Sequence, residues 1–196
     1  MPVAPRFDRN AALLIIDVQQ AMDSPVWGAR NSPELISRLR SVLECWRELR
    51  WPVYFVADDS TNPNSPYYPG QPGNDFKPEL APLDGEPIVR KSSGSAFVGT
   101  DLEAQLRGAG HQILVVGGFM TNKCVESTVR VAADLGFAVY VLADGTAAVG
   151  QIDYRGRWWD ADDVHHLALA NMRGERTRLI DVAQLLANAP TVDRPD

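Results

Sequence analysis

The sequence contains few cysteines and few histidines, and this scarcity excludes several kinds of protein. There are 2 Cys and 3 His among 196 residues. Two cysteines cannot build a disulfide-rich scaffold, and they do not supply the ligand set of a structural zinc site. The sequence leaves open the alternative that Cys45 and Cys124 form a single disulfide. A reducing cytoplasm is the simplest compartment for a chain with so few cysteines.

Long apolar runs and clusters of positive charge are also missing. No segment approaches the roughly 20 apolar residues of a membrane span, and residues 1–10 lack the apolar core of a signal peptide. The formal net charge is −6 and no basic run is visible, which argues against nucleic acid as the main partner. We therefore expect no membrane or nucleic-acid partner. We also expect one domain, residues 1–196, that buries a substantial core.

Predicted strands and helices alternate along the chain. Short apolar runs rich in β-branched residues are followed by segments whose apolar residues recur at helical spacing. This alternation predicts an α/β fold, a three-layer α/β/α sandwich with a mostly parallel central sheet and right-handed crossovers. Strands are expected at 12–16, 53–57, 87–90, 112–117, 138–142 and 177–181. Helices are expected at 33–50, 100–109, 124–135, 160–172 and 182–187.

Three reactive side chains stand at the ends of predicted strands. Asp17 and Lys91 each follow a strand, and Cys124 begins a helix shortly after another strand. Each residue alone is more often a turn, solvated or core residue. In a parallel sheet, however, these strand ends meet at the edge where ligands bind. An acid, a cation and a thiol there can form a nucleophile with its acid–base partner, and a helix N-terminus would favour a thiolate.

Two irregular segments are candidate walls of a pocket. The segment from Asp58 to Glu86 is rich in proline and glycine, so it cannot form a regular helix or a central strand. We expect it to be ordered, either as a pocket wall or lid or as an oligomer interface. The second segment runs from Gln151 to Asp160, and its tryptophans could instead pack against a helix or a subunit. Side chains expected to line the pocket, and to suit an uncharged or apolar acyl group, are Met22, Trp27, Tyr67, Phe97, Phe119, Met120, Trp158 and Trp159.

Three segments, in order and spacing, resemble the isochorismatase-like cysteine hydrolase superfamily. They are residues 14–19 (LIIDVQ), 91–102 (KSSGSAFVGTDL) and 116–128 (VGGFMTNKCVEST). The resemblance covers roughly residues 10–187. It implies the Rossmann-like fold of that superfamily and a cysteine-dependent hydrolase of C–N bonds in a small amide, ureido or carbamoyl compound. It also implies that the protein needs no cofactor and forms a homodimer or homotetramer.

The resemblance implies a catalytic triad of Asp17, Lys91 and Cys124. Cys124 would attack the carbonyl carbon to form a thioester, and Asp17 would pass the thiol proton to the leaving amine. Lys91 would lower the pKa of both partners. A cis peptide bond between Phe119 and Met120 is also implied, with the backbone N–H groups of Met120 and Cys124 forming an oxyanion hole.

The sequence departs from some relatives after the second predicted strand. Nicotinamidase-type members carry an Asp and two His there as metal ligands, whereas this chain reads Ala57-Asp58-Asp59-Ser60. We therefore expect no metal site. Asp58 stands where many non-metal relatives carry His, and an acid at that place would disfavour anionic substrates. We expect no catalytic role for His165 or His166, of which one is expected to be buried and the other exposed.

Three other functions stay open. Isochorismatase itself cleaves a vinyl ether without needing the cysteine, so retention of Cys124 favours the amidase branch. A non-catalytic oligomeric member of the fold is disfavoured by the complete triad. A nucleotide-binding Rossmann protein lacks support because Asp17-Val18-Gln19-Gln20, and not a G-x-G-x-x-G motif, follows the first strand.

Overall fold

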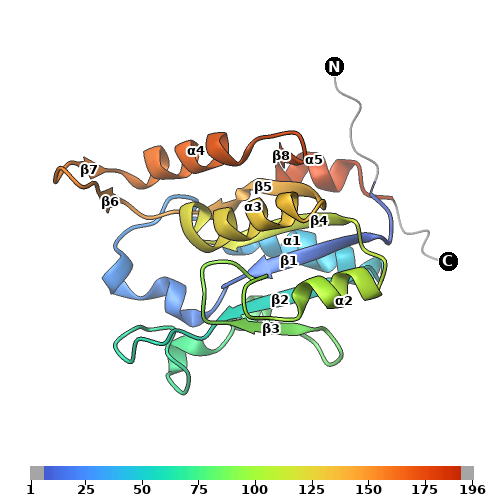
Figure 1. The fold of residues 1–196 in the computed structure, drawn as a ribbon, viewed down its shortest axis with the longest axis horizontal. Coiled ribbons are helices and arrows are strands. Elements are labelled where there is room, and N and C mark those ends of the chain that lie inside the picture. Colours follow the sequence, from blue (N-terminus) through green and yellow to red (C-terminus); the bar gives the residue numbers. More distant parts are fainter. Residues whose placement is uncertain (1–6, 191–196) are drawn as a thin grey trace.

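The computed structural model describes residues 7–190, which form a central sheet between two layers of helices (Figure 1). Six strands make this sheet in the order β3-β2-β1-β4-β5-β8, and every neighbouring pair is parallel. The predicted α/β fold is therefore confirmed. The strands are β1 (Ala11–Ile16), β2 (Val53–Asp58), β3 (Ile88–Lys91), β4 (Ile113–Phe119), β5 (Ala138–Ala147) and β8 (Thr177–Ile180).

The two helix layers cover opposite faces of the sheet. Leu13 and Ile15 of β1 belong to a buried cluster with α1 and α5, whereas Leu14 and Ile16 belong to a cluster with α2, α3 and α4. Because both faces of β1 are buried, its sequence is continuously apolar instead of alternating. The helices are α1 (Leu35–Glu48), α2 (Leu102–Gly108), α3 (Glu126–Asp134), α4 (Ala161–Met172) and α5 (Val182–Ala187). None of the helices within residues 7–190 has the length and apolar character needed to cross a bilayer.

The strand order reverses its direction between β1 and β4. From β1 the chain proceeds to β2 and β3 on one side, and it then returns to β4 beside β1 before continuing to β5 and β8. Such a switch point leaves a crevice at the carboxyl ends of the two central strands, where open α/β sheets bind ligands. The residues that follow β1 and β4 therefore lie beside this crevice.

The structure differs from the prediction in three places. A π-helical turn, Thr121–Val125, precedes α3, so the helix predicted at 124–135 starts later. Strand β5 is longer than 138–142 because a register shift between Val116 and Gly118 lets it continue beside β4 to Ala147. The segment predicted to be irregular before α4 contains an antiparallel hairpin of β6 (Gln151–Ile152) and β7 (Trp158–Trp159).

The long proline-rich segment has no strand between β2 and β3 and contains only short 3-10 turns. Its far end is fixed to the first helix, because Arg47 makes two hydrogen bonds, of 2.8 and 2.7 Å, to the carboxylate of Glu86. The 3-10 turns of the chain are η1 (Gln20–Asp23), η2 (Pro25–Trp27), η3 (Pro72–Asn74) and η4 (Pro78–Leu80).

Gly118 allows the two central strands to approach closely beside the crevice. Its φ is +138°, and a Cβ atom there would lie 2.1 Å from the carbonyl oxygen of Ile16. We expect Gly118→Ala to lower the free energy of unfolding by about 2–4 kcal/mol, from strain and overpacking combined. Urea denaturation measures this loss. Gly108→Ala is the control, since a Cβ there meets no atom within 4 Å; equal losses in both variants would contradict the explanation.

Candidate active site

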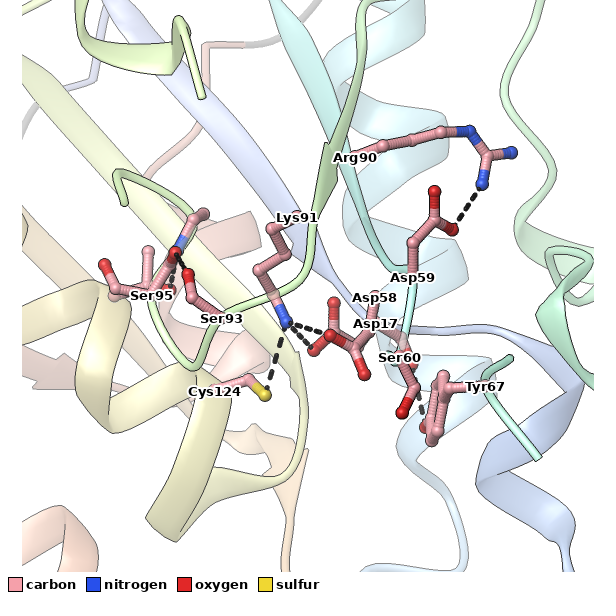
Figure 2. Close-up of polar contacts among 12 residues, drawn as sticks. Asp17, Asp58, Asp59, Ser60, Tyr67, Arg90, Lys91, Ser93, Ser95 and Cys124 are labelled. Carbon is pink, nitrogen blue, oxygen red and sulfur yellow. Dashed lines mark hydrogen bonds and ion pairs between the residues drawn. The ribbon is translucent and has the colours of Figure 1, made fainter. Parts of the chain in front are cut away.

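The ammonium group of Lys91 contacts three other side chains, which come from the ends of β1 and β2 and from the turn after β4. Lys91 ends β3, and its Nζ lies 2.8 Å from Asp17 Oδ2 and 3.1 Å from Asp58 Oδ1. The same Nζ lies 3.4 Å from Cys124 Sγ, as the dashed lines in Figure 2 show. The structure therefore brings together the three residues that the sequence placed at one sheet edge. It adds Asp58 as a second carboxylate on the lysine.

Asp17 leaves β1 in an uncommon backbone conformation. Its φ is +51°, in the left-handed region, which Asp and Asn tolerate better than most residues. Its backbone N–H donates a 2.9 Å hydrogen bond to the carbonyl of Val56, which continues the pairing with β2. One carboxylate oxygen binds Lys91, whereas Oδ1 is buried without a hydrogen-bond partner of ordinary geometry within the described residues. This oxygen is free to accept a proton.

Cys124 lies within the π-helical turn and not at the first residue of α3, which corrects the sequence-based placement. The N–H groups of Lys123 and Val125 both donate to the carbonyl of Met120, at 3.1 and 3.2 Å. The peptide bond between Phe119 and Met120 is cis, as the resemblance implied. Cys45 and Cys124 are both free thiols, so the disulfide left open by the sequence is not formed.

His165 fixes the beginning of this turn and was not predicted to do so. Its Nδ1 lies 2.8 Å from Thr121 Oγ1, and both side chains are buried. Burial, helped by neighbouring His166, lowers the pKa of His165. The imidazole is therefore neutral near neutral pH, and its Nδ1 can accept a hydrogen bond from the hydroxyl group of Thr121. His166 is exposed, so the expectation of one buried and one exposed histidine is confirmed.

Burial sets the protonation state of the site at rest. It raises the pKa of Asp17 to about 6, although Lys91 acts in the opposite direction. Burial and the Asp17 carboxylate raise the pKa of Cys124 to about 12, again against the effect of Lys91. The prediction that both pKa values would be lowered is wrong in net direction, because desolvation outweighs the single ammonium. At neutral pH the site holds a thiol and a carboxylate.

Lys91 remains charged in this environment. Burial alone would lower the pKa of Lys91, but the Asp17 carboxylate, the Cys124 sulfur and Asp58 together raise it above its ordinary value. The ammonium contacts both carboxylates, Asp17 at 2.8 Å and Asp58 at 3.1 Å. Across residues 7–190, no group of three or more His, Cys, Asp or Glu side chains is arranged to hold a metal.

A pocket of about 240 Å³ opens beside the thiol. Four of the large side chains predicted to line it do so, namely Trp27, Tyr67, Phe119 and Met120. The Tyr67 hydroxyl donates a 3.4 Å hydrogen bond to the carbonyl of Asp17, which ties this wall to the site. The remaining lining residues are Asp17, Asp58, Ser60, Ser65, Lys123 and Cys124.

The other four predicted lining residues lie elsewhere. Met22 is buried in the core beside α1, and Phe97 packs against Phe137 with ring centroids 5.9 Å apart. Trp158 is exposed and covers Gly150, where a Cβ would meet its ring. Trp159 lines a different cavity, of about 230 Å³, beside α4. The hairpin of β6 and β7 holds both tryptophans away from the thiol.

Gln19 and Asn74 hold the proline-rich segment in place beside the pocket. The sequence analysis predicted this role for neither residue. The Gln19 amide is fully buried; it accepts a 2.8 Å hydrogen bond from the backbone N–H of Asp58 and donates to the carbonyls of Asp58 and Asn74. Asn74 Nδ2 donates to the carbonyls of Asp58 and Tyr67, both at 2.9 Å. Four residues of the segment line the pocket, so the expected pocket wall is confirmed, whereas the expected oligomer interface stays a prediction.

The electrostatic arrangement predicts opposite effects of two substitutions on thiol reactivity. In a Cys45→Ala background, Asp17→Asn should speed alkylation of Cys124 by iodoacetamide near neutral pH about tenfold or more, because a negative neighbour that raises the thiol pKa is removed. Lys91→Met should slow it, because the ammonium lowers that pKa. Intact-mass time courses from pH 6 to 10 measure the rates. Equal rates in all three folded proteins would contradict the coupling.

Comparisons with known proteins identify relatives that match most of the chain. The model of the isochorismatase domain family matches residues 11–184. A solved structure of a protein described as a hydrolase of the isochorismatase family, from Chromobacterium violaceum, superposes with a TM-score of 0.92 at 46% identity. That match covers 96% of this chain and 98% of the other. An uncharacterized isochorismatase family protein of Bacillus subtilis, YrdC, is 35% identical over 91% of this chain and 96% of its own length.

Two more distant relatives carry names that state an activity. The streptothricin hydrolase of Streptomyces noursei is 32% identical over 69% of this chain and 49% of that protein. The ureidoacrylate amidohydrolase RutB of Klebsiella pneumoniae is 27% identical over 72% of this chain and 75% of that protein. The match to the family model spans most of the chain, and together with the site it shows that the chain belongs to the isochorismatase family of hydrolases.

Proposed function

We propose that this protein is a cysteine-dependent hydrolase of C–N bonds in a small amide, ureido or carbamoyl compound. The observation that carries the proposal is the position of Lys91 Nζ, which contacts both the Asp17 carboxylate and the Cys124 sulfur beside a pocket. The named activities of the streptothricin hydrolase and the ureidoacrylate amidohydrolase support C–N bond chemistry. Asp17, Lys91 and Cys124 act as the catalytic triad.

Asp17 is the base for the first step. The thiol is protonated at rest because its pKa is about 12, whereas Asp17, with a pKa of about 6, is ionised at neutral pH. As Cys124 Sγ attacks the carbonyl carbon, Asp17 takes the thiol proton, and the electron pair of the carbonyl bond moves to oxygen. The thiolate is thus generated during attack and is not stored in the resting enzyme.

Two backbone N–H groups stabilise the oxyanion in this proposal. The N–H of Met120, at the cis peptide, and the N–H of Cys124 donate to the negative oxygen of the tetrahedral intermediate. Lys91 stays positive throughout and contacts both groups that exchange the proton, the Asp17 carboxylate and the Cys124 sulfur. It therefore stabilises negative charge whether that charge is on Asp17 or on the sulfur.

The second half of the reaction returns the enzyme to its resting state. The C–N bond breaks as Asp17 donates its proton to the leaving nitrogen, which leaves the acyl group on Cys124 as a thioester. Water then attacks the thioester carbonyl while Asp17 accepts a proton from it. The C–S bond breaks as Asp17 returns this proton to the leaving sulfur, which releases the acid and restores the thiol. No step requires a cofactor.

The setting of the enzyme is also a proposal. A cytoplasmic location would keep the catalytic thiol reduced, in agreement with two free cysteines. We also propose that each chain forms one catalytic unit and that the chains assemble into a homodimer or a homotetramer.

Loss of the thiol should abolish hydrolysis. We expect a panel of small primary amides and ureido compounds to include substrates that release ammonia, and Cys124→Ala should lower kcat/KM at least about 10⁴-fold because no nucleophile remains. Coupled detection of ammonia measures the rate, and Cys45→Ala is the matched control that should retain activity. Cleavage of vinyl ethers that survives in Cys124→Ala would favour an ether hydrolase. Inactivity on all compounds would favour a non-catalytic member.

The pH dependence of the reaction should report on Asp17. Because this carboxylate must be ionised to act as base and its pKa is raised to about 6, kcat/KM should fall about tenfold per pH unit below about pH 6. Stopped-time assays from pH 4.5 to 8 measure the profile. Circular dichroism at each pH checks that the protein stays folded. An acid limb near pH 4 would contradict the role of a buried Asp17.

A further inference from the structure

Asp58 is the most exposed member of the buried ion cluster that it forms with Lys91 and Asp17. The exposed fractions of the side chains are 0% for Lys91, 3% for Asp17 and 23% for Asp58. Asp58 also lines the pocket next to the thiol. A molecule that enters the pocket can therefore make polar contact with the carboxylate of Asp58, while Lys91 is closed off behind it.

The orientation of Asp58 is fixed from several sides. Its N–H donates to Gln19 Oε1 at 2.8 Å, and its carbonyl accepts hydrogen bonds from Gln19 and Asn74 at 3.1 and 2.9 Å. Its Oδ1 accepts from Lys91 Nζ at 3.1 Å. Because one oxygen is held by the lysine, the carboxylate is pre-organised, and its binding of a ligand costs little conformational entropy.

The charges around the pocket favour a positive ligand. Two carboxylates, Asp17 and Asp58, share the single ammonium of Lys91, so the cluster carries a net charge of −1 when both acids are ionised. The aromatic side chains of Trp27 and Tyr67 stand in the same pocket, and the faces of such rings attract cations. Lys123 is the opposing charge, but it is exposed at the pocket, where solvent and salt screen it.

We propose that Asp58 determines specificity by selecting substrates that carry a cationic group, such as an ammonium or guanidinium, near the scissile bond, and by rejecting carboxylates. This proposal rests on the proposed function for its physiological meaning. The selection itself is a property of the pocket and can be measured without any amide substrate. Asp58 binds the substrate in this scheme and takes no part in proton transfer.

Charged thiol reagents test this selection directly. Three methanethiosulfonates, bearing a trimethylammonium-ethyl, a sulfonato-ethyl or a methyl group, each form a disulfide with Cys124 and release methanesulfinate. In the full chain with Cys45→Ala, intact mass at pH 7.5 gives the rate at which each reagent modifies Cys124. Each rate is divided by the rate at which the same reagent reacts with glutathione. We expect the cationic reagent to exceed the anionic one by about tenfold or more, as a charge a few ångströms away produces in a partly solvated site. Asp58→Asn should reduce this ratio toward 1.

The ratio separates ligand selection from thiol activation. Asp58 also raises the pKa of Cys124, so Asp58→Asn should speed all three reagents together, and this common factor cancels in the ratio. Asp59→Asn is the matched control, because Asp59 pairs with Arg90 at 2.8 Å and does not line the pocket. Its ratio should equal that of the parent protein.

Two results would overturn the proposal. One is an unchanged ratio in a folded Asp58→Asn variant. The other is a preference for the anionic reagent that Lys123→Gln removes, which would place selection on the lysine. Neither result depends on amide hydrolysis, so failure of this proposal and failure of the proposed function are distinguishable. If amides are hydrolysed, matched cationic and anionic acyl groups should show the same order of kcat/KM.

Discussion

The buried ammonium of Lys91 is the charge on which the arrangement of the site depends. A fully buried cation is stable only where counter-charges and hydrogen bonds replace its water. The ends of β1 and β2 supply two carboxylates, and the turn after β4 supplies a sulfur. One lysine therefore links segments that are remote in the sequence, and the same contacts that stabilise its charge set the acidity of the acid and the thiol.

The parallel sheet makes this convergence possible. Its strand order places β1 and β4 side by side with their carboxyl ends together, and β3 reaches the same edge from two strands away through the length of the lysine side chain. The close approach at Gly118 and the left-handed backbone of Asp17 then determine how the chain leaves the two central strands. The fold positions reactive groups that gain their chemistry from shared burial.

Sequence reasoning found the strands, the helices and the three residues Asp17, Lys91 and Cys124, because strand ends in a parallel sheet follow from local patterns. It missed the contact of Gln19 with Asn74, which depends on the path of the proline-rich loop. It also missed the contact of Thr121 with His165, which depends on how α4 packs against the π-helical turn. It also gave the wrong direction for two pKa values, because the extent of desolvation is a property of the assembled core. The hairpin that carries Trp158 away from the pocket had no strong local signal.

The central position of β1 has a consequence for the growing chain. Strands β1, β2 and β3 are synthesised first and can pair with one another, but the second edge of β1 stays open until β4 follows much later. That edge belongs to a wholly apolar strand, and open apolar edges are templates for aggregation. A nascent or truncated chain that ends before Ile113 would expose it to other chains. Arrival of β4 covers the edge and brings Cys124 to Lys91 and Asp17, so protection from self-association and assembly of the candidate site occur together.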